Sequence, residues 1–406
     1  MDDNKVSIIG LGRLGLCQAL TFERAGCNVL GCDVSAEYVA TINSRTLQSS
    51  EPGVEEALRS SSQLRATTSL AECVDHSALL FILVATPTGL GDHAYDCGTL
   101  SRLLEDIAAL RRPGKHVVIG CTVLPGYIAN VGSALLADCE GCTLSYNPEF
   151  IAQGEILSGL AAPELVLIGE GSEAAGDALE ALYARATSSV PVVCRMSPAS
   201  AEIAKLALNC FITAKISFAN MVADIADRTP RADKNDILRA LGADGRIGPR
   251  CLRPGYGFGG PCFPRNNRCF SGFVKQLGLD SPMADATDHI NGVVTDVLVQ
   301  RAISYIKKIN CKNVIIYGLA YKPGTSVCEA SFSVFLIKAL KEAFNHELQL
   351  SVIDPCVNLD QIDALFGNAQ VLKKDSASGL KSDDLVIACH PLEHQEVLCK
   401  VLSFWN

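Results

Sequence analysis

The chain has 406 residues, of which 48% are hydrophobic and 19% charged, a composition typical of a folded protein with two or three domains. Its net charge of −9 argues against nonspecific nucleic-acid binding. No apolar run approaches the ~18 residues of a membrane span. The acidic start lacks the basic leader of a secretory signal, so we expect a cytoplasmic protein whose 18 cysteines are reduced thiols. Cys139 and Cys142 form a CxxC, but no second ligand pair accompanies it, so no metal site is expected.

The first half of the chain alternates strands with helices. Residues Lys5 to Gly10 predict a strand, a glycine-rich turn and a helix follow, and a second strand ends at Asp33. This βαβ unit is followed by further predicted strands and helices up to about residue 196. The strands are 78–86, 116–122, 142–146 and 164–170, and the helices include 100–112 and 173–186. Such alternation predicts a doubly wound parallel sheet.

The pattern changes in the middle of the chain. Residues 197–228 are helical throughout and longer than an average globular helix, which predicts a spine between domains or a subunit interface. After a loop rich in glycine and arginine, alternation resumes near Val294, with strands at 313–318, 348–354 and 384–390. We therefore predict an α/β protein in which two Rossmann-like, doubly wound parallel-sheet domains are joined by a central helical domain. The predicted bounds are 1–196, 197–293 and 294–406.

A glycine motif predicts a dinucleotide site in the first domain. Gly10-Leu11-Gly12-Arg13-Leu14-Gly15 matches GxGxxG and lies between a predicted strand and a predicted helix. The glycines allow a tight turn and a close approach of the backbone to a pyrophosphate, which the helix amides receive. Asp33 ends the next strand, 18 residues after Gly15, where a carboxylate accepts ribose hydroxyls and repels a 2′-phosphate. NAD is therefore favoured over NADP.

A second motif places one cysteine in a glycine-rich loop. Cys262 lies in GYGFGGPCFPRNN (255–267), and it is either a nucleophile or one more buried thiol. Arginines cluster nearby in this acidic protein and suggest a site for an anion such as diphosphate, although each could be a solvated surface charge. They are Arg246, Arg250, Arg253 and Arg265. Lys205 and Asn209 project from one face of the apolar long helix, either as part of a polar site or, for the lysine, as a snorkelling side chain.

Taken together, these segments resemble the UDP-glucose/GDP-mannose dehydrogenase family over essentially the full chain. The markers are GLGRLG, VATPT (84–88), CTVLPG (121–126), NPEF (147–150), AEIAKLALNCFITAKISFAN (201–220), GRIG (245–248), PGYGFGGPCFP (254–264) and GLAYK (318–322). The resemblance implies oxidation of a sugar C6 alcohol to a carboxylate with two NAD and a cysteine, as from UDP-glucose to UDP-glucuronate. It also implies a homodimer formed through the long helix.

The resemblance assigns roles to individual residues. Cys262 would capture the C6 aldehyde, Lys205 and Asn209 would stabilise the oxyanion, and Glu149 and Thr122 would handle protons, water or the nicotinamide. The implied NAD-binding residues are Gly10, Gly12, Arg13, Leu14, Gly15, Asp33, Thr86, Pro87, Thr122 and Glu149. The implied substrate-binding residues are Phe150, Lys205, Asn209, Arg246 (reaching into a neighbouring subunit), Arg253, Tyr256, Gly257, Phe258, Gly259 and Lys322, with Asp354 near the uridine diphosphate.

The chain departs from the family pattern at the chemistry. Asn266 stands where the family has an aspartate, and an asparagine keeps hydrogen bonds but cannot accept a proton. Other departures are Arg265 for a lysine, Gln153 for a glutamate, Leu165 for an arginine and Glu329 for an arginine. Three functions stay open: a C6 dehydrogenase with unusual proton handling, a redox catalyst that retains NAD such as an epimerase, and a noncatalytic protein that binds nucleotide sugars.

Overall fold

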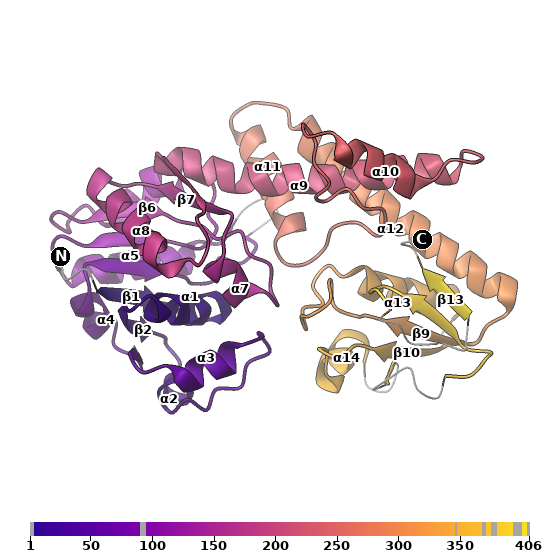
Figure 1. Ribbon diagram of the computed structural model, residues 1–406, viewed down its shortest axis with the longest axis horizontal. Helices are drawn as coiled ribbons and strands as arrows, with labels where there is room; N and C mark the ends of the chain where they lie inside the picture. The colour runs from indigo at the N-terminus through magenta and orange to yellow at the C-terminus, as the bar shows by residue number, and fades with distance from the viewer. Residues whose placement is uncertain are drawn as a thin grey trace. The chain divides into compact units, whose positions relative to one another are not determined.

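The computed structural model describes residues 4–89, 95–345, 347–367, 371–374, 380–392 and 400–403. The chain divides into two compact units, Met1–Ala207 and Leu208–Asn406, each with its own sheet (Figure 1). The three-domain division of the sequence analysis stays a prediction.

The first unit is built on an eight-stranded sheet in the order β3-β2-β1-β4-β5-β6-β7-β8. The strands pair in parallel, as predicted for a doubly wound sheet, except that β6 and β7 run antiparallel. Their bounds are β1 (Lys5–Ile9), β2 (Asn28–Cys32), β3 (Leu64–Thr67), β4 (Leu79–Ile82), β5 (His116–Ile119), β6 (Thr143–Tyr146), β7 (Leu165–Gly169) and β8 (Val192–Met196).

Helices cover both faces of this sheet. Along β4, Leu79 and Phe81 join one apolar core while Leu80 and Ile82 join the other, because successive strand residues point to opposite faces. The helical segments are α1 (Arg13–Arg24), α2 (Ala36–Asn43), α3 (Val54–Ser60), α4 (Leu70–His76), α5 (Gly98–Ala109), η2 (Ile128–Gly132), α6 (Ser133–Leu135), α7 (Ile156–Ala161) and α8 (Glu173–Ala186).

The CxxC pair lies in the turn between α6 and β6. Cys139 and Cys142 are joined by a disulfide, and both sulfur atoms lie beside the carbonyl oxygen of Arg112, at 3.1 and 3.4 Å. Gly141, between them, has a φ of +67°, a conformation that glycine adopts without a steric penalty. The expectation that the cysteines are reduced thiols is therefore corrected for this pair.

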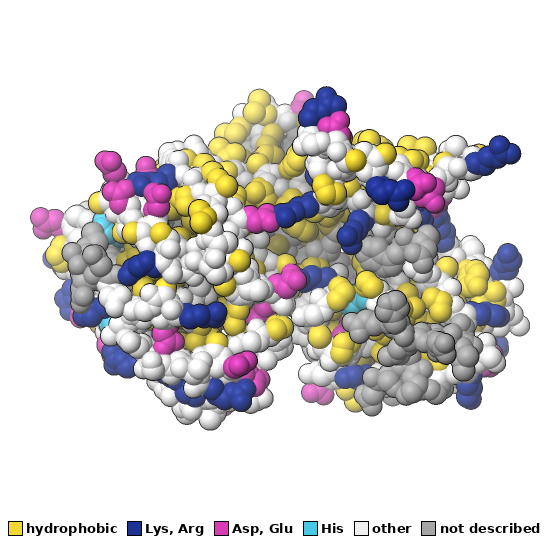
Figure 2. Space-filling model, viewed as in Figure 1, with side chains coloured by type: hydrophobic (Ala, Val, Ile, Leu, Met, Phe, Trp, Pro, Cys, Tyr) yellow, Lys and Arg dark blue, Asp and Glu magenta, His cyan; other side chains and the backbone are white. Residues whose placement is uncertain are grey.

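The long central helix, α9 (Pro198–Asp227), confirms the helix predicted at 197–228. By length and composition alone it could cross a membrane, but its polar residues Glu202, Lys205 and Asn209 are buried within the protein, as in a core helix. Its last part carries exposed Phe211, Phe218 and Ile225 at seven-residue spacing, and apolar side chains are visible where α9 runs (Figure 2).

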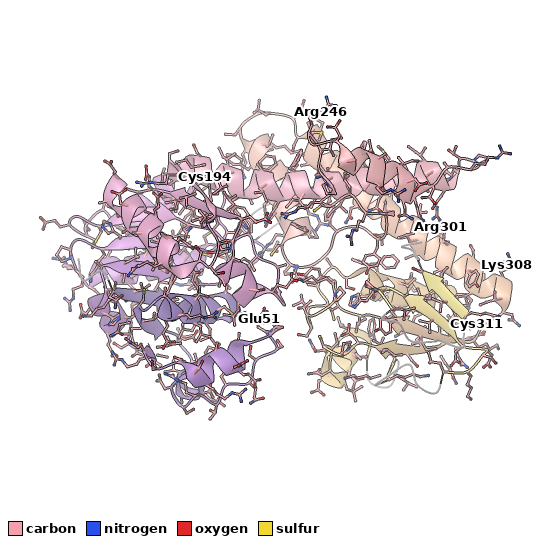
Figure 3. The ribbon with its side chains drawn as sticks, in the orientation of Figure 1. Glu51, Cys194, Arg246, Arg301, Lys308 and Cys311 are labelled. Atoms are coloured by element: carbon pink, nitrogen blue, oxygen red, sulfur yellow. A yellow bond between two sulfur atoms is a disulfide. The ribbon has the colours of Figure 1, made fainter. Side chains whose placement is uncertain are left out.

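Three helices lie between α9 and the second sheet along the chain: α10 (Lys234–Ala243), α11 (Phe263–Gln276) and α12 (Pro282–Ile309). Arg301 of α12, labelled in Figure 3, forms ion pairs with Asp224 (3.2 Å) and Asp227 (2.8 Å) near the end of α9. The predicted boundary at residues 293–294 falls inside α12, so this helix continues from the helical region towards the second sheet.

The second sheet has the order β11-β10-β9-β12-β13, and its described strands are parallel. The order β10-β9-β12 repeats the order β2-β1-β4 of the first sheet. The elements are β9 (Asn313–Tyr317), α13 (Phe332–Ala343), β10 (Gln349–Ile353), α14 (Leu359–Phe366), β11 (Leu372–Lys373), β12 (Leu385–Ala388) and β13 (Lys400–Ser403). The predicted second Rossmann-like sheet is confirmed.

In both sheets, an aspartate accepts hydrogen bonds from backbone amides in the turn after the first strand, β1 or β9. In the first, Asp33 accepts hydrogen bonds from the amides of Leu11 (3.1 Å) and Ser35 (3.1 Å). In the second, the buried Asp354 accepts from the amide of Leu319 (2.7 Å) in the same way. Asp354 also accepts from the amides of Ala320, Cys356 and Val357. The two domains therefore share one local design at corresponding strand ends.

Candidate active site

The three motif glycines of the first domain play different parts. Gly10 has a φ of +92°, and a Cβ there would lie 2.6 Å from the Leu83 carbonyl oxygen. A Cβ on Gly15 would overlap the Gly10 carbonyl, so both glycines are required for packing. Gly12 has nothing within 4 Å of the corresponding position, and no side chain caps the helix α1 that begins beside it. The open space at Gly12 and the uncapped amides fit a pyrophosphate, so these residues fit NAD.

Other predicted cofactor residues lie in this turn or in loops that follow the sheet strands. Asp33 is partly exposed and uses each carboxylate oxygen for one amide, which leaves acceptor capacity for a ribose hydroxyl. Arg13 donates to the Gln153 side chain (3.0 Å), so the glutamine that replaces the family's glutamate contacts the glycine motif. The Thr86 hydroxyl donates to the Thr122 carbonyl (2.8 Å) and joins two loops at the carboxyl ends of strands. Leu14 packs against the core, and Pro87 is exposed.

The predicted catalytic lysine is held by the segment that carries Glu149. Lys205, only 6% exposed, donates a hydrogen bond to the backbone carbonyl of Glu149. Its ammonium also lies 4.3 Å from the centre of the Phe150 ring, within the range of a cation–π interaction. The structure therefore brings Lys205, Glu149 and Phe150 together, and the snorkelling alternative for Lys205 is wrong because the ammonium is buried.

The side chain of Glu149 meets a group of polar residues that the sequence did not reveal. The Tyr183 hydroxyl lies 2.9 Å from Glu149 Oε1 and 2.7 Å from Asn147 Oδ1. The Gln18 amide lies 3.2 Å from the same hydroxyl and 3.4 Å from Glu149 Oε1. Burial raises the pKa of Glu149, while the Tyr183 hydrogen bond and the charge of Lys205 act to lower it. This carboxyl therefore takes up a proton more readily than an exposed glutamate.

Glu202 is a fully buried carboxylate that the sequence did not single out. It lies on α9, three residues before Lys205, and accepts hydrogen bonds from the amides of Gly126 (2.7 Å) and Ile128 (2.8 Å). Burial raises its pKa, and the two amides act to lower it. Since Thr122 opens the loop that contains Gly126, Glu202 ties this loop to the lysine-bearing helix. The sequence signal that could have identified Glu202 is a glutamate in the apolar stretch of the predicted helix.

In the second unit, Cys262 stands at the start of α11. It is exposed and occupies the N-cap position, with Pro264 in the first turn, so it lies at the end of the helix where negative charge is stabilised. The alternative of a buried thiol is wrong. Asn266 follows one turn later with 2% exposure, and its amide donates to the Cys262 carbonyl (2.8 Å). A carboxylate at position 266 would therefore be a buried group on the same helix as the thiol.

The glycines before Cys262 are closely packed against protein. A Cβ on Gly257 would overlap the Asn291 side chain, and one on Gly259 would overlap the Ala330 carbonyl oxygen. Gly260, with a φ of +81°, packs on the ring of Tyr321, and its amide donates to the Glu329 carbonyl (3.0 Å). The cysteine loop is thus fitted against α12 and residues 321–330.

The flanking aromatic residues hold the same loop. Tyr256 stacks on Phe332 with a ring separation of 5.2 Å and an interplanar angle of 1°. The Asn291 side chain makes two hydrogen bonds to the backbone of Phe258, accepting at 2.8 Å and donating at 3.0 Å. The predicted substrate residues at 256–259 therefore form one segment, which these contacts hold in place.

The predicted arginines and Lys322 are distributed over separate places in the second unit. Arg246 is 89% exposed, pairs with Asp244, and extends from the loop after α10 (Figure 3). Lys215 of α9 holds this loop through the Ile247 carbonyl (3.0 Å). Arg253 and Glu329 are also exposed, and Lys322 is partly buried. The oxygens of Asp354 are engaged by backbone amides, so this residue organises the turn beside Lys322.

The predicted residues therefore form two sets, one in each unit. Lys205 and Asn209, both buried, lie one turn apart on α9, on either side of the division between the units. Within the described residues, no group of three or more His, Cys, Asp or Glu side chains could hold a metal ion.

Comparison with known proteins identifies the family. The NAD-binding domain of the UDP-glucose/GDP-mannose dehydrogenase family matches residues 4–187, and the central domain of that family matches residues 199–292. The chain belongs to this family. It is an NAD-dependent oxidoreductase with nucleotide-sugar 6-dehydrogenase activity, and its partner is a nucleotide sugar.

Individual relatives agree with this assignment. The UDP-glucose 6-dehydrogenase of Pseudomonas aeruginosa is 31% identical, over 87% of this chain and 79% of its own. The GDP-mannose 6-dehydrogenase of Pseudomonas savastanoi pv. phaseolicola is 29% identical, over 94% of this chain and 90% of its own. A solved UDP-glucose dehydrogenase from Pyrobaculum islandicum matches with a TM-score of 0.85 at 27% identity, covering 99% of this chain and 95% of that one.

Proposed function

We propose that this dehydrogenase oxidises the C6 alcohol of UDP-glucose to the carboxylate of UDP-glucuronate, with Cys262 as the nucleophile. The observation that carries the proposal is that one chain contains both an exposed thiol at the start of α11 and a buried ammonium fixed on Glu149 and Phe150. Relatives named for UDP-glucose and for GDP-mannose both match. The segment Asn147-Pro148-Glu149-Phe150 favours UDP-glucose by resemblance.

The reaction removes four electrons and adds one water. NAD, when bound, accepts one hydride in each of two oxidations. The first oxidation converts the C6 alcohol to an aldehyde, and the Cys262 sulfur then bonds to the aldehyde carbon to give a thiohemiacetal. Lys205 and Asn209 stabilise the negative charge on its oxygen. Loss of the second hydride gives a thioester, and water replaces the sulfur to release the acid. The balance is RCH₂OH + 2 NAD⁺ + H₂O → RCOO⁻ + 2 NADH + 3 H⁺.

Proton handling distinguishes this chain from the family pattern. Asn266 cannot accept a proton from the attacking water, so we assign that task to Glu149, with Thr122 positioning the water. The same asparagine favours a second candidate, a redox catalyst that retains NAD and releases an isomerised sugar. The noncatalytic alternative of the sequence analysis is disfavoured by the family and by the retention of Cys262 and Lys205.

One measurement separates these candidates. Purified protein is incubated with NAD and UDP-glucose, and the NADH formed is counted for each sugar consumed. Two NADH per sugar support the proposed oxidation. Sugar conversion without net NADH would establish the epimerase-type reaction instead, and binding without turnover would establish the noncatalytic protein. GDP-mannose in a parallel reaction tests the choice of nucleotide sugar.

The nucleophile is tested by substitution. Cys262→Ser should reduce acid formation by at least about a thousandfold, since loss of a covalent nucleophile removes a whole chemical route. Cys251→Ser is the matched control, because Cys251 is also exposed and lies in the same loop region. If Cys262→Ser retains the activity of Cys251→Ser, the nucleophile assignment is wrong.

We also propose that the chain forms a homodimer through α9, with Arg246 reaching a neighbouring subunit's site. The stripe of Phe211 (67% exposed), Phe218 and Ile225 (58% exposed) supports this, because contiguous exposed apolar side chains are typical of interfaces. Light scattering should give twice the mass of one chain for wild type and one mass for Phe211→Asp. Val190→Asp is the control, since Val190 is fully exposed in the first unit. The cytoplasmic location stays a prediction.

A further inference from the structure

We propose that Tyr183 is a positioning residue whose hydroxyl proton turns from Asn147 to Glu149 as Glu149 releases a proton, and back again as Glu149 takes one up. The inference rests on the proposed function, in which Glu149 handles the protons of the oxidation.

The geometry around Tyr183 requires a choice between two acceptors. Its hydroxyl oxygen lies 2.7 Å from Asn147 Oδ1 and 2.9 Å from Glu149 Oε1. A phenol carries one proton and cannot donate to both. Asn147 is oriented by its Nδ2, which donates to the Leu167 carbonyl (2.9 Å), so its Oδ1 faces Tyr183 as an acceptor. Burial and the neighbouring Glu149 raise the pKa of Tyr183 well above its ordinary value, so the phenol keeps its proton.

Each protonation state of Glu149 gives the Tyr183 proton a different acceptor. When Glu149 is a carboxylate, Tyr183 donates to it in a charge-assisted hydrogen bond. When Glu149 is a carboxylic acid, its own proton is donated to the Tyr183 oxygen, and the Tyr183 proton turns to Asn147. A proton released by the C6 hydroxyl or the attacking water therefore ends on Glu149, while the O–H bond of Tyr183 only rotates.

The remaining neighbours of Glu149 fit this account. The Gln18 amide, from α1, approaches both the Tyr183 oxygen and Glu149 Oε1 and can donate in either state. Gln18 Oε1 is buried without a hydrogen-bond partner among the described residues, so the glutamine is held by its amide group. The charged group that faces Glu149 from α9 is the ammonium of Lys205, which lowers the pKa of Glu149 by its charge. Among the described residues, Tyr183 of α8 is the other titratable group that acts on the pKa of Glu149.

This arrangement explains how the site works without an aspartate at position 266. Asn266 cannot receive a proton. Burial raises the pKa of Glu149, which makes proton uptake easier, and Tyr183 can form a hydrogen bond with Glu149 in both of its protonation states. Tyr183 touches Glu149 but is not assigned any contact with substrate, so it acts on the reaction through Glu149.

The test is a titration of Glu149 without turnover. The carboxyl C=O stretch of Glu149 is followed by infrared difference spectroscopy between pH 4 and 9 and identified by its loss in Glu149→Gln. Tyr183→Phe should move the midpoint up by roughly one pH unit, because the carboxylate loses a charge-assisted hydrogen bond. Asn147→Ala should move it down, because the acid form loses the acceptor that completes its chain. Tyr127→Phe is the control, since that buried hydroxyl bonds to Ser101 (2.9 Å) away from Glu149.

Opposite shifts in Tyr183→Phe and Asn147→Ala support the proposal, since a residue that only stabilises the fold would not move the midpoint. An unchanged midpoint, or shifts in the same direction in both variants, would overturn it; should Tyr183→Phe not fold, the direction of the Asn147→Ala shift decides. The acidic limb of kcat should move with the midpoint. If the opposite shifts occur in a protein that makes no uronic acid, the role of Tyr183 stands and the proposed C6 oxidation fails.

Discussion

The ammonium of Lys205 lies 4.3 Å from the centre of the Phe150 ring and donates to the carbonyl of the preceding residue, Glu149. One short segment thus fixes the cation through its backbone and its aromatic ring. A fixed ammonium stabilises developing negative charge without first having to reorganise.

Lys205→Met should therefore lower kcat by about 10²–10³-fold while leaving NAD affinity unchanged, because a single oxyanion donor contributes about that much. Steady-state kinetics and NAD titration check both parts. Lys215→Met offers a contrast on the same helix. Lys215 holds the Arg246 loop through the Ile247 carbonyl, so its loss should raise KM for the sugar more than it lowers kcat. Near-normal kcat in Lys205→Met would contradict the assigned role.

The glycine motif can be separated into a binding and a packing part. Gly12→Ala should fold with wild-type stability, since the new methyl meets no protein atom, but NAD affinity should fall at least about tenfold, or about 1.4 kcal/mol. Gly15→Ala should lower stability by about 1–3 kcal/mol, because its methyl overlaps the Gly10 carbonyl. Calorimetry for NAD binding and urea denaturation distinguish the two. Equal stability loss in both variants would show that the space at Gly12 is not open.

Asn266→Asp restores the acid/base group that the family carries. A general base typically contributes about 10²–10⁴-fold, and since Glu149 already serves here, we expect kcat to rise by about tenfold. Asn267→Asp is the control, because Asn267 is equally buried but bonds to Thr213 and to the Ala284 carbonyl. Both variants should lose at least about 1 kcal/mol of stability from the buried carboxylate. An unchanged kcat in Asn266→Asp would show that the missing base does not limit the rate.

The raised pKa of Glu149 predicts a stability effect with a definite sign. A carboxyl whose folded pKa exceeds its ordinary value of 4.5 binds more protons in the native state, so its contribution to stability is full below pH 4.5 and is lost as the pH rises through the folded pKa. Glu149→Gln cannot titrate. The free energy of unfolding of this variant relative to wild type should therefore increase as the pH rises above 4.5, by at most about 1.4 kcal/mol per pH unit. Urea denaturation from pH 4 to 8 measures it, and a difference that falls with pH would contradict the raised pKa.

Sequence patterns predicted the regular elements better than the short ones. The helix at 197–228 was found almost to the residue because nothing breaks it after Pro198. β3 and β8 were missed; they lie at the two edges of the sheet and are less buried than the central strands β4 and β5. The start of α12 was missed because Pro282 to Asn291 mixes polar and apolar residues without a clear period.

Site residues were predictable where they belong to a local sequence motif. They were not predictable where residues far apart in the sequence come together in the fold. The glycine turn, Asp33 and Cys262 follow from their neighbours in the sequence. Gln18 and Tyr183 are 165 positions apart, and only the folded sheet brings both to Glu149. The glycines at 257, 259 and 260 illustrate the opposite case: the motif was visible, but the structure shows that it packs the loop against Asn291, Ala330 and Tyr321.

The corresponding turns held by Asp33 and Asp354 show that one backbone arrangement can have two different roles. Asp33 is partly exposed and binds two amides, and the turn it holds opens outward at Gly12. Asp354 is buried and binds four amides, and its turn is closed by the ring of His390 against Gly318 and the Ala320 carbonyl. The two carboxylates therefore differ in their remaining hydrogen-bond capacity. Asp33 can still accept hydrogen bonds from a ligand, whereas the acceptor sites of Asp354 are occupied by the backbone.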